Sequence, residues 1–286
     1  MNEKIEYKVL ARKYRPQTFA DLIGQETLVQ ILTNAITTNR IANAYLLTGV
    51  RGVGKTTTAR LIAMSLNCEN KKDDSCEPCG TCESCKSIRS DHNLDVIEMD
   101  AASKTGVDDV REIIDNVKYK PVNCKFKIFI IDEVHMLSKS AFNALLKTLE
   151  EPPEHVKFIF ATTEVKKIPV TILSRCQRFD LKRVESKDLI QHLKKISELE
   201  KVKIDEDAIS LLVRAGDGSV RDSLSLLDQA IINTDTSVSA ETVANMLGLA
   251  DRGKIYELLG HIAKGCLLYT SPSPRDATLS RMPSSA

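Results

Sequence analysis

A short glycine-rich segment carries the clearest chemical signal in this sequence. Residues 49–56 read GVRGVGKT, which matches the pattern G-x-x-x-x-G-K-[S/T]. Glycines at this spacing let backbone N–H groups surround phosphate oxygens, and a helix that begins here adds a positive dipole. We predict that Lys55 lies against the β- and γ-phosphates of a nucleotide and that the Thr56 hydroxyl ligates Mg²⁺. The alternative is a glycine-rich turn without a ligand.

Two adjacent carboxylates supply what a phosphate-binding loop alone lacks. The segment FIIDEVH places Asp132 at the end of an apolar run and Glu133 directly after it. Asp132 can reach a magnesium ion through its water shell, and Glu133 can polarise an attacking water. Two acids at the end of a buried strand are unfavourable unless they face a ligand. The alternative is that they end the strand in solvent. His135 is expected to be a packing or supporting residue rather than a ligand.

Five of the eight cysteines lie in one loop, NCENKKDDSCEPCGTCESCK, at residues 67–86. Because cytosolic thiols stay reduced, a cluster of this density indicates a metal rather than disulfides. Four thiolates would form a closed, tetrahedral zinc site with a structural role. By spacing alone, Cys76 to Cys85 is an unbroken C-x₂-C series, a pattern close to that of iron–sulfur ferredoxins. Cys68 and Cys76 therefore compete for the fourth position.

The elements around these residues alternate in type. Apolar runs predict strands, and helical spacing predicts helices between them. The predicted strands are residues 45–48, 94–101, 126–132 and 156–163, and the predicted helices are 55–66, 107–119 and 139–153. This alternation predicts a parallel α/β sheet. From Ser186 onwards four helical patterns follow one another. We therefore expect a nucleotide-binding domain at residues 1–183, with the cysteine module at about 67–90, and an all-helical domain at 184–247.

The composition of the chain excludes several classes of protein. Of the 286 residues, 42% are apolar and 28% are charged, which is typical of a soluble protein with a core. The formal net charge of +1 gives no global argument for binding to nucleic acid or to a membrane surface. No apolar run approaches the roughly 18 residues of a membrane span, and the N-terminus lacks the apolar core of a secretory signal. We expect a cytoplasmic protein without a membrane partner.

The C-terminal segment differs from the rest of the chain. Residues 266–286 begin CLLYTSPSPRD, are rich in serine and proline, and follow a helical pattern abruptly. The beginning of this segment resembles the translated read-through of a sequencing-library adapter, so we expect residues 266–286 to be an artefactual, disordered tail. A natural disordered tail is the alternative. In the first case the natural protein is expected to continue beyond Gly265.

Taken together, the motifs resemble the AAA+ ATPases and, within them, the gamma/tau clamp-loader family of bacterial DNA polymerase III. The similarity covers nearly all of residues 8–265. It rests on ARKYRPQTFADLIGQE, GVRGVGKT, IDEVHML, FNALLKTLEEPPEHVKFIFATT, ILSRC and GSVRDSLSLLDQ. The resemblance implies an AAA+ P-loop NTPase fold with a parallel sheet, an inserted zinc module and an all-helical lid. It also implies that residues 248–265 begin a truncated helical collar domain.

The roles of single residues follow from the same resemblance. It places sensor 1 at Thr163, with Thr162 beside it, and sensor 2 at Arg221. It places the arginine finger at Arg175, which would serve the ATP of a neighbouring subunit. The alternatives are ordinary surface ion pairs for the two arginines and a structural role for Thr163.

The resemblance also selects the ligands of each site. For zinc it selects Cys68, Cys79, Cys82 and Cys85, which leaves Cys76 as an extra thiol. For magnesium it agrees with Thr56 and Asp132. It places the N-terminal box beside the adenine. The residues expected to contact the nucleotide are Tyr14, Arg15, Pro16, Gly49, Val50, Arg51, Gly52, Val53, Gly54, Lys55, Thr56 and Thr57.

The implied function is that of an ATP-hydrolysing motor subunit of the replicative clamp loader within the DNA polymerase III holoenzyme, with ATP, Mg²⁺ and Zn²⁺ as cofactors. Its expected partners are other clamp-loader subunits in a ring, a sliding clamp and primed DNA. Without a collar domain, this chain is expected to assemble poorly and to hydrolyse ATP slowly. One alternative is a clamp-loader-like structural subunit, although such relatives lack a working phosphate loop. Another AAA+ DNA-processing ATPase and a zinc-based nucleic-acid-binding module are the remaining alternatives.

Overall fold

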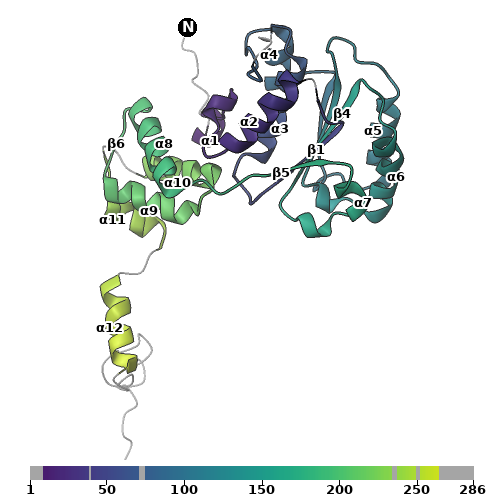
Figure 1. The fold of residues 1–286 in the computed structure, drawn as a ribbon. Coiled ribbons are helices and arrows are strands. Elements are labelled where there is room, and N and C mark those ends of the chain that lie inside the picture. The colour runs from purple at the N-terminus through teal and green to yellow at the C-terminus, as the bar shows by residue number, and fades with distance from the viewer. Residues whose placement is uncertain (1–8, 39, 71–74, 234–236, 249–251, 264–286) are drawn as a thin grey trace, which may run out of the picture.

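The structure is a computed structural model that describes residues 9–38, 40–70, 75–233, 237–248 and 252–263. It consists of an α/β part with a central sheet, a smaller helical part, and the helix α12 (Arg252–Ala263) (Figure 1). The helix predicted near residues 251–265 is thus present. The expectation of an artefactual tail at 266–286 concerns residues outside the described ranges. Within those ranges, no helix is long and apolar enough to cross a bilayer.

Five parallel strands form the predicted sheet. They are β1 (Ala44–Thr48), β2 (Val96–Asp100), β3 (Lys127–Asp132), β4 (Val156–Thr162) and β5 (Gln177–Asp180). The strand order β2-β3-β4-β1-β5 places β3, β4 and β1 in the interior of the sheet. These strands are covered on both faces, which is why their sequences are continuous apolar runs. The edge strand β5 was not predicted, because its four residues, QRFD, include a single apolar side chain, Phe179.

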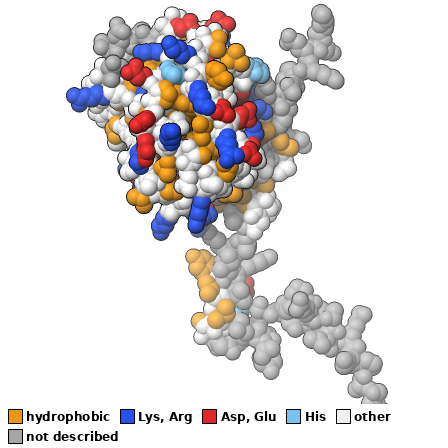
Figure 2. Space-filling model, turned by 90° about the vertical axis from the view of Figure 1, so that its right-hand side faces the viewer, with side chains coloured by type: hydrophobic (Ala, Val, Ile, Leu, Met, Phe, Trp, Pro, Cys, Tyr) orange, Lys and Arg blue, Asp and Glu red, His pale blue; other side chains and the backbone are white. Residues whose placement is uncertain are grey.

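Helices cover both faces of this sheet (Figure 1). In β4, Phe158 and Phe160 point to one face, whereas Ile159 points to the other, as the two-residue period of a strand requires. The Phe158 side is covered by α5 (Val107–Val117) and α6 (Lys139–Glu150), and the Ile159 side by α2 (Glu26–Thr37) and α3 (Lys55–Asn67). On the face that carries α5 and α6, acidic and basic side chains are interspersed (Figure 2). That face therefore offers no patch of a single charge sign.

The remaining elements of the α/β part are short. They are α4 (Glu83–Arg89), α7 (Val170–Leu173), and the 3₁₀ turns η1 (Phe19–Asp21), η2 (Val134–Met136) and η3 (Val165–Lys167). Three of them lie within or beside motifs that the sequence analysis singled out. The turn η2 comes directly after Glu133, α4 begins inside the cysteine loop, and α7 leads to Arg175.

The helical part has an apolar core of its own. Its helices are α8 (Ser186–Leu199), α9 (Glu206–Gly216), α10 (Val220–Ile232) and α11 (Ala240–Met246), with two-residue strands β6 (Lys203–Ile204) and β7 (Ser237–Val238) paired beside them. Leu189, Leu212 and Leu227 are fully buried in this core. The short N-terminal helix α1 (Leu10–Lys13) packs here as well, because Leu10 belongs to the same cluster. The first described residues therefore join the helical part to the sheet.

A buried carboxylate fixes the loop that leads into β3. Asp95 is only 1% exposed and accepts hydrogen bonds from the backbone N–H groups of Val122, Asn123 and Cys124, at 2.8, 2.7 and 2.9 Å. The side chain of Asn67 pairs with both the N–H and the C=O of Phe126, each at 2.9 Å. These contacts set where β3 enters the sheet, and so where its acidic end emerges.

We predict that Asp95→Ala lowers the free energy of unfolding by roughly 2–3 kcal/mol, because three amides lose a charged acceptor. Asp108→Ala is the matched control, since its side chain is 92% exposed and forms a surface ion pair with Arg111 on the same helix. The control is expected to change stability by no more than about 0.5 kcal/mol. Urea denaturation followed by circular dichroism measures both. Equal stability of the two variants would show that Asp95 does not support this loop.

Candidate functional site

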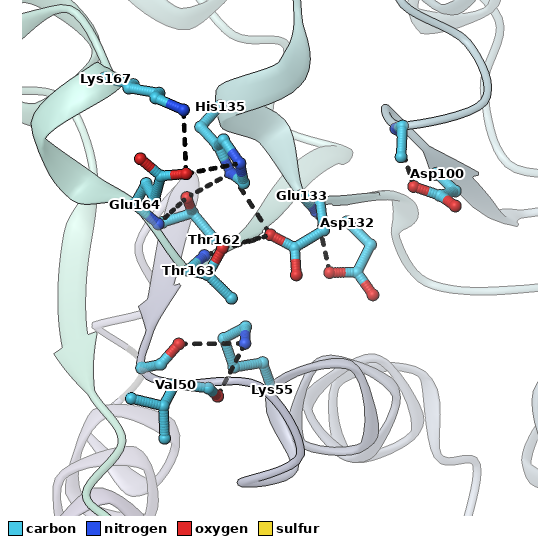
Figure 3. A network of polar contacts seen from close by, with 12 residues as sticks. Val50, Lys55, Asp100, Asp132, Glu133, His135, Thr162, Thr163, Glu164 and Lys167 are labelled. Carbon is cyan, nitrogen blue, oxygen red and sulfur yellow. Dashed lines mark hydrogen bonds and ion pairs between the residues drawn. The ribbon is translucent and has the colours of Figure 1, made fainter. Parts of the chain in front are cut away.

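The glycine-rich loop connects the end of β1 to the beginning of α3. Gly52 and Gly54 have φ angles of +79° and +99°, in the left-handed region that favours glycine. The side chain of Lys55 is only 5% exposed, and its ammonium donates to the carbonyls of Gly49 and Val50 at 3.1 and 3.0 Å (Figure 3). The loop therefore curves around the Lys55 ammonium. Its turns at Gly52 and Gly54 give the concave backbone that binds anions in loops of this kind.

The predicted magnesium ligands meet at the end of β3. The Thr56 hydroxyl donates a hydrogen bond to Oδ2 of Asp132. A hydroxyl and a carboxylate are hard oxygen donors, which suit Mg²⁺. Burial lowers the pKa of the Lys55 ammonium, while the negative charges of Glu133 and Asp132 oppose this shift. Lys55, Thr56, Asp132 and Glu133 thus form one charged cluster, although they come from two distant segments.

Glu133 contacts Thr163 and His135 through one carboxylate oxygen. Its Oε2 accepts from the backbone N–H and the hydroxyl of Thr163, at 3.2 and 3.0 Å, and lies 3.3 Å from Nδ1 of His135 (Figure 3). The backbone of Glu133 has a φ of +46°, which is uncommon for a residue other than glycine. Strained backbone conformations often occur at active sites, where they direct a side chain. Thr163, predicted as sensor 1, therefore contacts the acid that was predicted to polarise water.

His135 lies between Glu133, Thr162 and Glu164. Its side chain is 6% exposed, and Nδ1 lies 3.1 Å from the Thr162 hydroxyl as well as close to Glu133. Its other nitrogen, Nε2, lies 3.7 Å from a carboxylate oxygen of Glu164, which also accepts from Lys167 at 2.9 Å. The imidazole thus connects the end of β4 to the acid after β3. A histidine two residues after an acid pair was the available signal, but only the folded sheet brings Thr162 and Glu164 to it.

A cavity of about 880 Å³ lies over the glycine-rich loop. This volume falls in the range of small-molecule sites. Four regions contribute to its lining, namely the N-terminal segment, the glycine-rich loop and α3 with the acids of β3, the end of β2, and the helical part. The predicted residues that line it are Tyr14, Arg15, Pro16, Arg51, Gly52, Val53, Gly54, Lys55, Thr56, Thr57, Asp132, Glu133 and Arg221.

Two arginines that line the cavity lie close to the loop. Nε of Arg15 donates to the Thr57 hydroxyl at 3.0 Å, and burial lowers the pKa of its guanidinium. Arg221 lies at the beginning of α10, where its backbone N–H donates to the Gly52 carbonyl at 3.3 Å. A Cβ atom on Gly52 would lie 1.9 Å from Oγ of Ser219. The helical part therefore touches the loop directly, and a larger residue at position 52 would separate them.

His192 is a lining residue that sequence reasoning did not single out. It lies on α8, and its Nε2 is buried and has no hydrogen-bond partner among the described residues. Burial lowers the pKa of this imidazole, so it is neutral near pH 7. A helical pattern alone marks His192 as one polar position among several. Its relation to the cavity appears only when α8 packs against the N-terminal segment.

Arg175 lies apart from this cavity. It is not among the described residues that line the cavity, and its guanidinium pairs with Glu150 at 2.6 Å. A second hydrogen bond goes to the carbonyl of Thr171. The side chain is 32% exposed. In this conformation Arg175 is therefore at the surface, where another chain could reach it.

Four of the five clustered cysteines come together. The sulfur atoms of Cys68, Cys79, Cys82 and Cys85 lie within 4.8 Å of one another. Three of these sulfurs accept backbone N–H groups of the same loop, at 3.3–3.4 Å. The N–H groups of Cys82 and Thr81 lower the pKa of Cys79 to about 6, which favours the thiolate that a metal needs. This is the set that the resemblance selected.

Cys76 lies outside this group. It is 2% exposed and packs against α2, where the Thr33 hydroxyl lies 2.9 Å from its sulfur. The spacing of the cysteines alone favoured Cys76, and only the resemblance selected Cys68. The distinction between them comes from the packing of the loop on α2, which spacing does not encode.

Comparisons with known proteins agree with this geometry. A family model described as DNA polymerase III, delta subunit, matches residues 24–185, more than half of the chain. A second, described as DNA polymerase III clamp loader subunit, ATPase lid domain, matches residues 188–236. Among solved structures, the Thermotoga maritima RuvB Holliday junction branch migration motor has a TM-score of 0.59 at 19% identity, over 88% of this chain and 80% of that one. At this identity the likeness shows a shared fold alone.

Curated relatives are much closer in sequence. DNA polymerase III subunit tau/gamma of Haemophilus influenzae is 52% identical over 91% of this chain and 38% of its own length. Subunit tau of Escherichia coli is 51% identical over 89% of this chain and 39% of its own length. Subunit gamma of Buchnera aphidicola from Acyrthosiphon pisum is 49% identical over 86% of this chain and 67% of its own length. The chain thus spans about two fifths of the length of the first two relatives.

We predict that Cys68→Ser lowers the metal content of the purified protein by at least half, because a serine hydroxyl is a poor replacement for a thiolate. Cys76→Ser is the matched control and is expected to keep the full content, since Cys76 lies outside the group. Elemental analysis across the first-row transition metals measures both. Loss of metal in Cys76→Ser with retention in Cys68→Ser would reverse the assignment.

Proposed function

The chain belongs to the gamma/tau family of DNA polymerase III clamp-loader subunits, and on this premise we propose that it is an ATP-hydrolysing motor subunit that loads a sliding clamp onto primed DNA. One observation carries the proposal. Lys55, Thr56, Asp132 and Glu133 converge beside a cavity of about 880 Å³ that Arg221 approaches from the helical part. A non-hydrolysing structural subunit has no use for this complete set.

The loop would bind the triphosphate by exchanging its internal contacts. The Lys55 ammonium now donates to two loop carbonyls, and a nucleotide would offer it phosphate oxygens instead. Thr56 and Asp132 would hold the magnesium ion, which neutralises charge that develops on the phosphates. Glu133 would accept a proton from the attacking water, with its carboxylate oriented by Thr163 and His135.

Two arginines would complete the site from outside the α/β part. Arg221 would report on nucleotide in its own cavity, because the beginning of α10 touches the loop at Gly52. Arg175 would act on the nucleotide of a neighbouring subunit. Its ion pair with Glu150 is at the surface, where such pairs contribute only about 0–1 kcal/mol. Arg175 could therefore leave Glu150 and bind a phosphate of the neighbouring site at a small cost in free energy.

We also propose that the cysteine group holds zinc in a structural role. Four sulfurs at about 2.3 Å from one zinc ion lie about 3.8 Å apart in a tetrahedron. The cluster, with all sulfurs within 4.8 Å of one another, is close to this size and leaves no ligand position open. A metal here would close a loop that has many polar residues.

The partners of the whole protein are part of the same proposal, since this chain matches only part of the longer relatives. Other clamp-loader subunits would form a ring with it, and that ring would contact the clamp. DNA would be held through Lys and Arg contacts with phosphates rather than by reading bases. Because the net charge of the chain is only +1, these contacts would be confined to a local surface. We propose that the protein acts in the cytoplasm, where these partners would be found.

We predict that Lys55→Ala weakens ATP binding by tenfold or more, because a buried cation that faces the phosphates is removed. Lys147→Ala, an exposed lysine on α6, is the matched control and should bind ATP normally. Isothermal titration calorimetry with Mg²⁺ and ATP measures both affinities. If the two variants bind ATP equally, the glycine-rich loop is not the nucleotide site.

We predict that Arg175→Ala leaves the ATP affinity of a subunit within twofold but lowers turnover in the assembled complex by about 10³-fold, the effect expected for an arginine finger. Arg178→Ala is the control, because Arg178 is also an exposed arginine paired with a carboxylate. Steady-state ATPase assays on complexes built from full-length subunits measure the turnover. Unchanged turnover in Arg175→Ala, or equal loss in the control, would contradict a role in a neighbouring site.

A further inference from the structure

Four consecutive backbone amides near the N-terminus are held by two carboxylates. The N–H groups of Gln17 and Thr18 donate to Asp21, at 3.4 and 3.1 Å. Those of Phe19 and Ala20 donate to the two oxygens of Glu77, each at 2.9 Å. Asp21 belongs to the same turn, whereas Glu77 comes from the cysteine loop, 58 residues away from Phe19. The amides at the η1 turn are therefore bound both by an acid of the same turn and by an acid of the cysteine loop.

This turn connects two segments that line the cavity. Tyr14, Arg15 and Pro16 line it before the turn, and Asp21, Leu22 and Ile23 line it after the turn. Phe19, in the middle, is 1% exposed and belongs to the same apolar cluster as Cys76, Cys82 and Cys85. The cysteine loop thus packs against the turn and also supplies its outer acceptor. A displacement of this turn would move both lining segments.

The position of Glu77 depends on the fold of the cysteine loop. Its own N–H donates to the Ser75 hydroxyl at 3.0 Å, and its neighbours Cys76 and Pro78 are both buried. Two residues further on, Cys79 joins the four-sulfur group and donates its N–H to the sulfur of Cys68 at 3.3 Å. Glu77 therefore lies in a segment that is attached to the four-sulfur group two residues further on.

We propose that Glu77 is a positioning residue that couples the cysteine metal site to the nucleotide cavity. With the loop closed, the Glu77 carboxylate holds the turn at residues 17–21, and the turn holds the segments that face the nucleotide. Glu77 itself does not line the cavity, so it acts through the backbone that it caps. Because coupling between two sites is reciprocal, the metal raises the affinity for nucleotide, and nucleotide raises the retention of metal. This inference rests on the proposed nucleotide site.

The first test compares Glu77→Ala with Glu83→Ala, which removes an exposed carboxylate from the same cysteine module. In the full-length, zinc-loaded protein, we expect Glu77→Ala to weaken ATP binding about tenfold, or about 1.4 kcal/mol, and to keep its zinc. Glu83→Ala should bind ATP as the unaltered protein does. In the assembled complex, KM for ATP should rise with little change in kcat, because Glu77 does not contact the reacting atoms.

Two further readouts separate this role from general destabilisation. Amide hydrogen exchange at residues 19 and 20 should accelerate in Glu77→Ala, while exchange in the core strands stays unchanged. Glu77→Gln keeps one carbonyl oxygen as an acceptor, so its ATP affinity should lie between those of the unaltered protein and Glu77→Ala. It also serves as the test variant if the alanine variant does not fold.

The second test measures the coupling itself. Removing zinc with a chelator should weaken ATP binding in the unaltered protein, but should weaken it much less in Glu77→Ala, because the connecting carboxylate is already absent. The inference would be overturned if Glu77→Ala bound ATP with the affinity of the unaltered protein. It would also be overturned if zinc removal lowered the ATP affinity of both proteins by the same factor. Failure of the unaltered, zinc-loaded protein to bind ATP would instead overturn the proposed function.

Discussion

A buried ammonium group has to find hydrogen-bond acceptors inside the fold, and Lys55 finds them in the loop that surrounds it. The carbonyls of Gly49 and Val50 accept its protons, and the carboxylates after β3 balance its charge. These contacts therefore fix the positions of the loop, the first turn of α3 and the end of β3 relative to one another. A site that is already organised loses less conformational freedom when a polyanion binds.

The same constraint shapes the surroundings of the loop. Because Gly52 carries no side chain, Ser219 and the beginning of α10 can pack directly on the loop. Arg15 contacts the first turn of α3, directly after the loop, through a hydrogen bond to the Thr57 hydroxyl. The cavity is thus built at the meeting point of the sheet, the helical part and the N-terminal segment. A change in the angle between the two parts would change the contacts of the loop, and through these contacts the proposed nucleotide site could be linked to movement.

The sequence predicted those features whose cause is local. The glycine spacing of residues 49–56 identified the loop, and the apolar run before Asp132 identified the strand that presents the acids. Features that depend on distant packing were not predictable from pattern. The edge strand β5 carries one apolar residue, and the contact of Glu77 with the turn near Phe19 joins residues far apart in sequence. His135 was expected to pack or support, but its partners come from β4 and the turn after it. The exclusion of Cys76 from the cysteine group likewise depends on its packing against α2.

The cysteine loop is inserted between α3 and β2, in a connection that crosses from one strand of the sheet to another. Connections of this kind tolerate gain and loss of residues during evolution, since the strands keep their pairing. The hydrogen bonds from Phe19 and Ala20 to Glu77 add a second attachment, which is not covalent. A descendant that lost the whole module, Glu77 included, would also lose the acceptor of these two amides. Loss of the module would therefore change the contacts of a turn near the N-terminus, at a distant point of the chain.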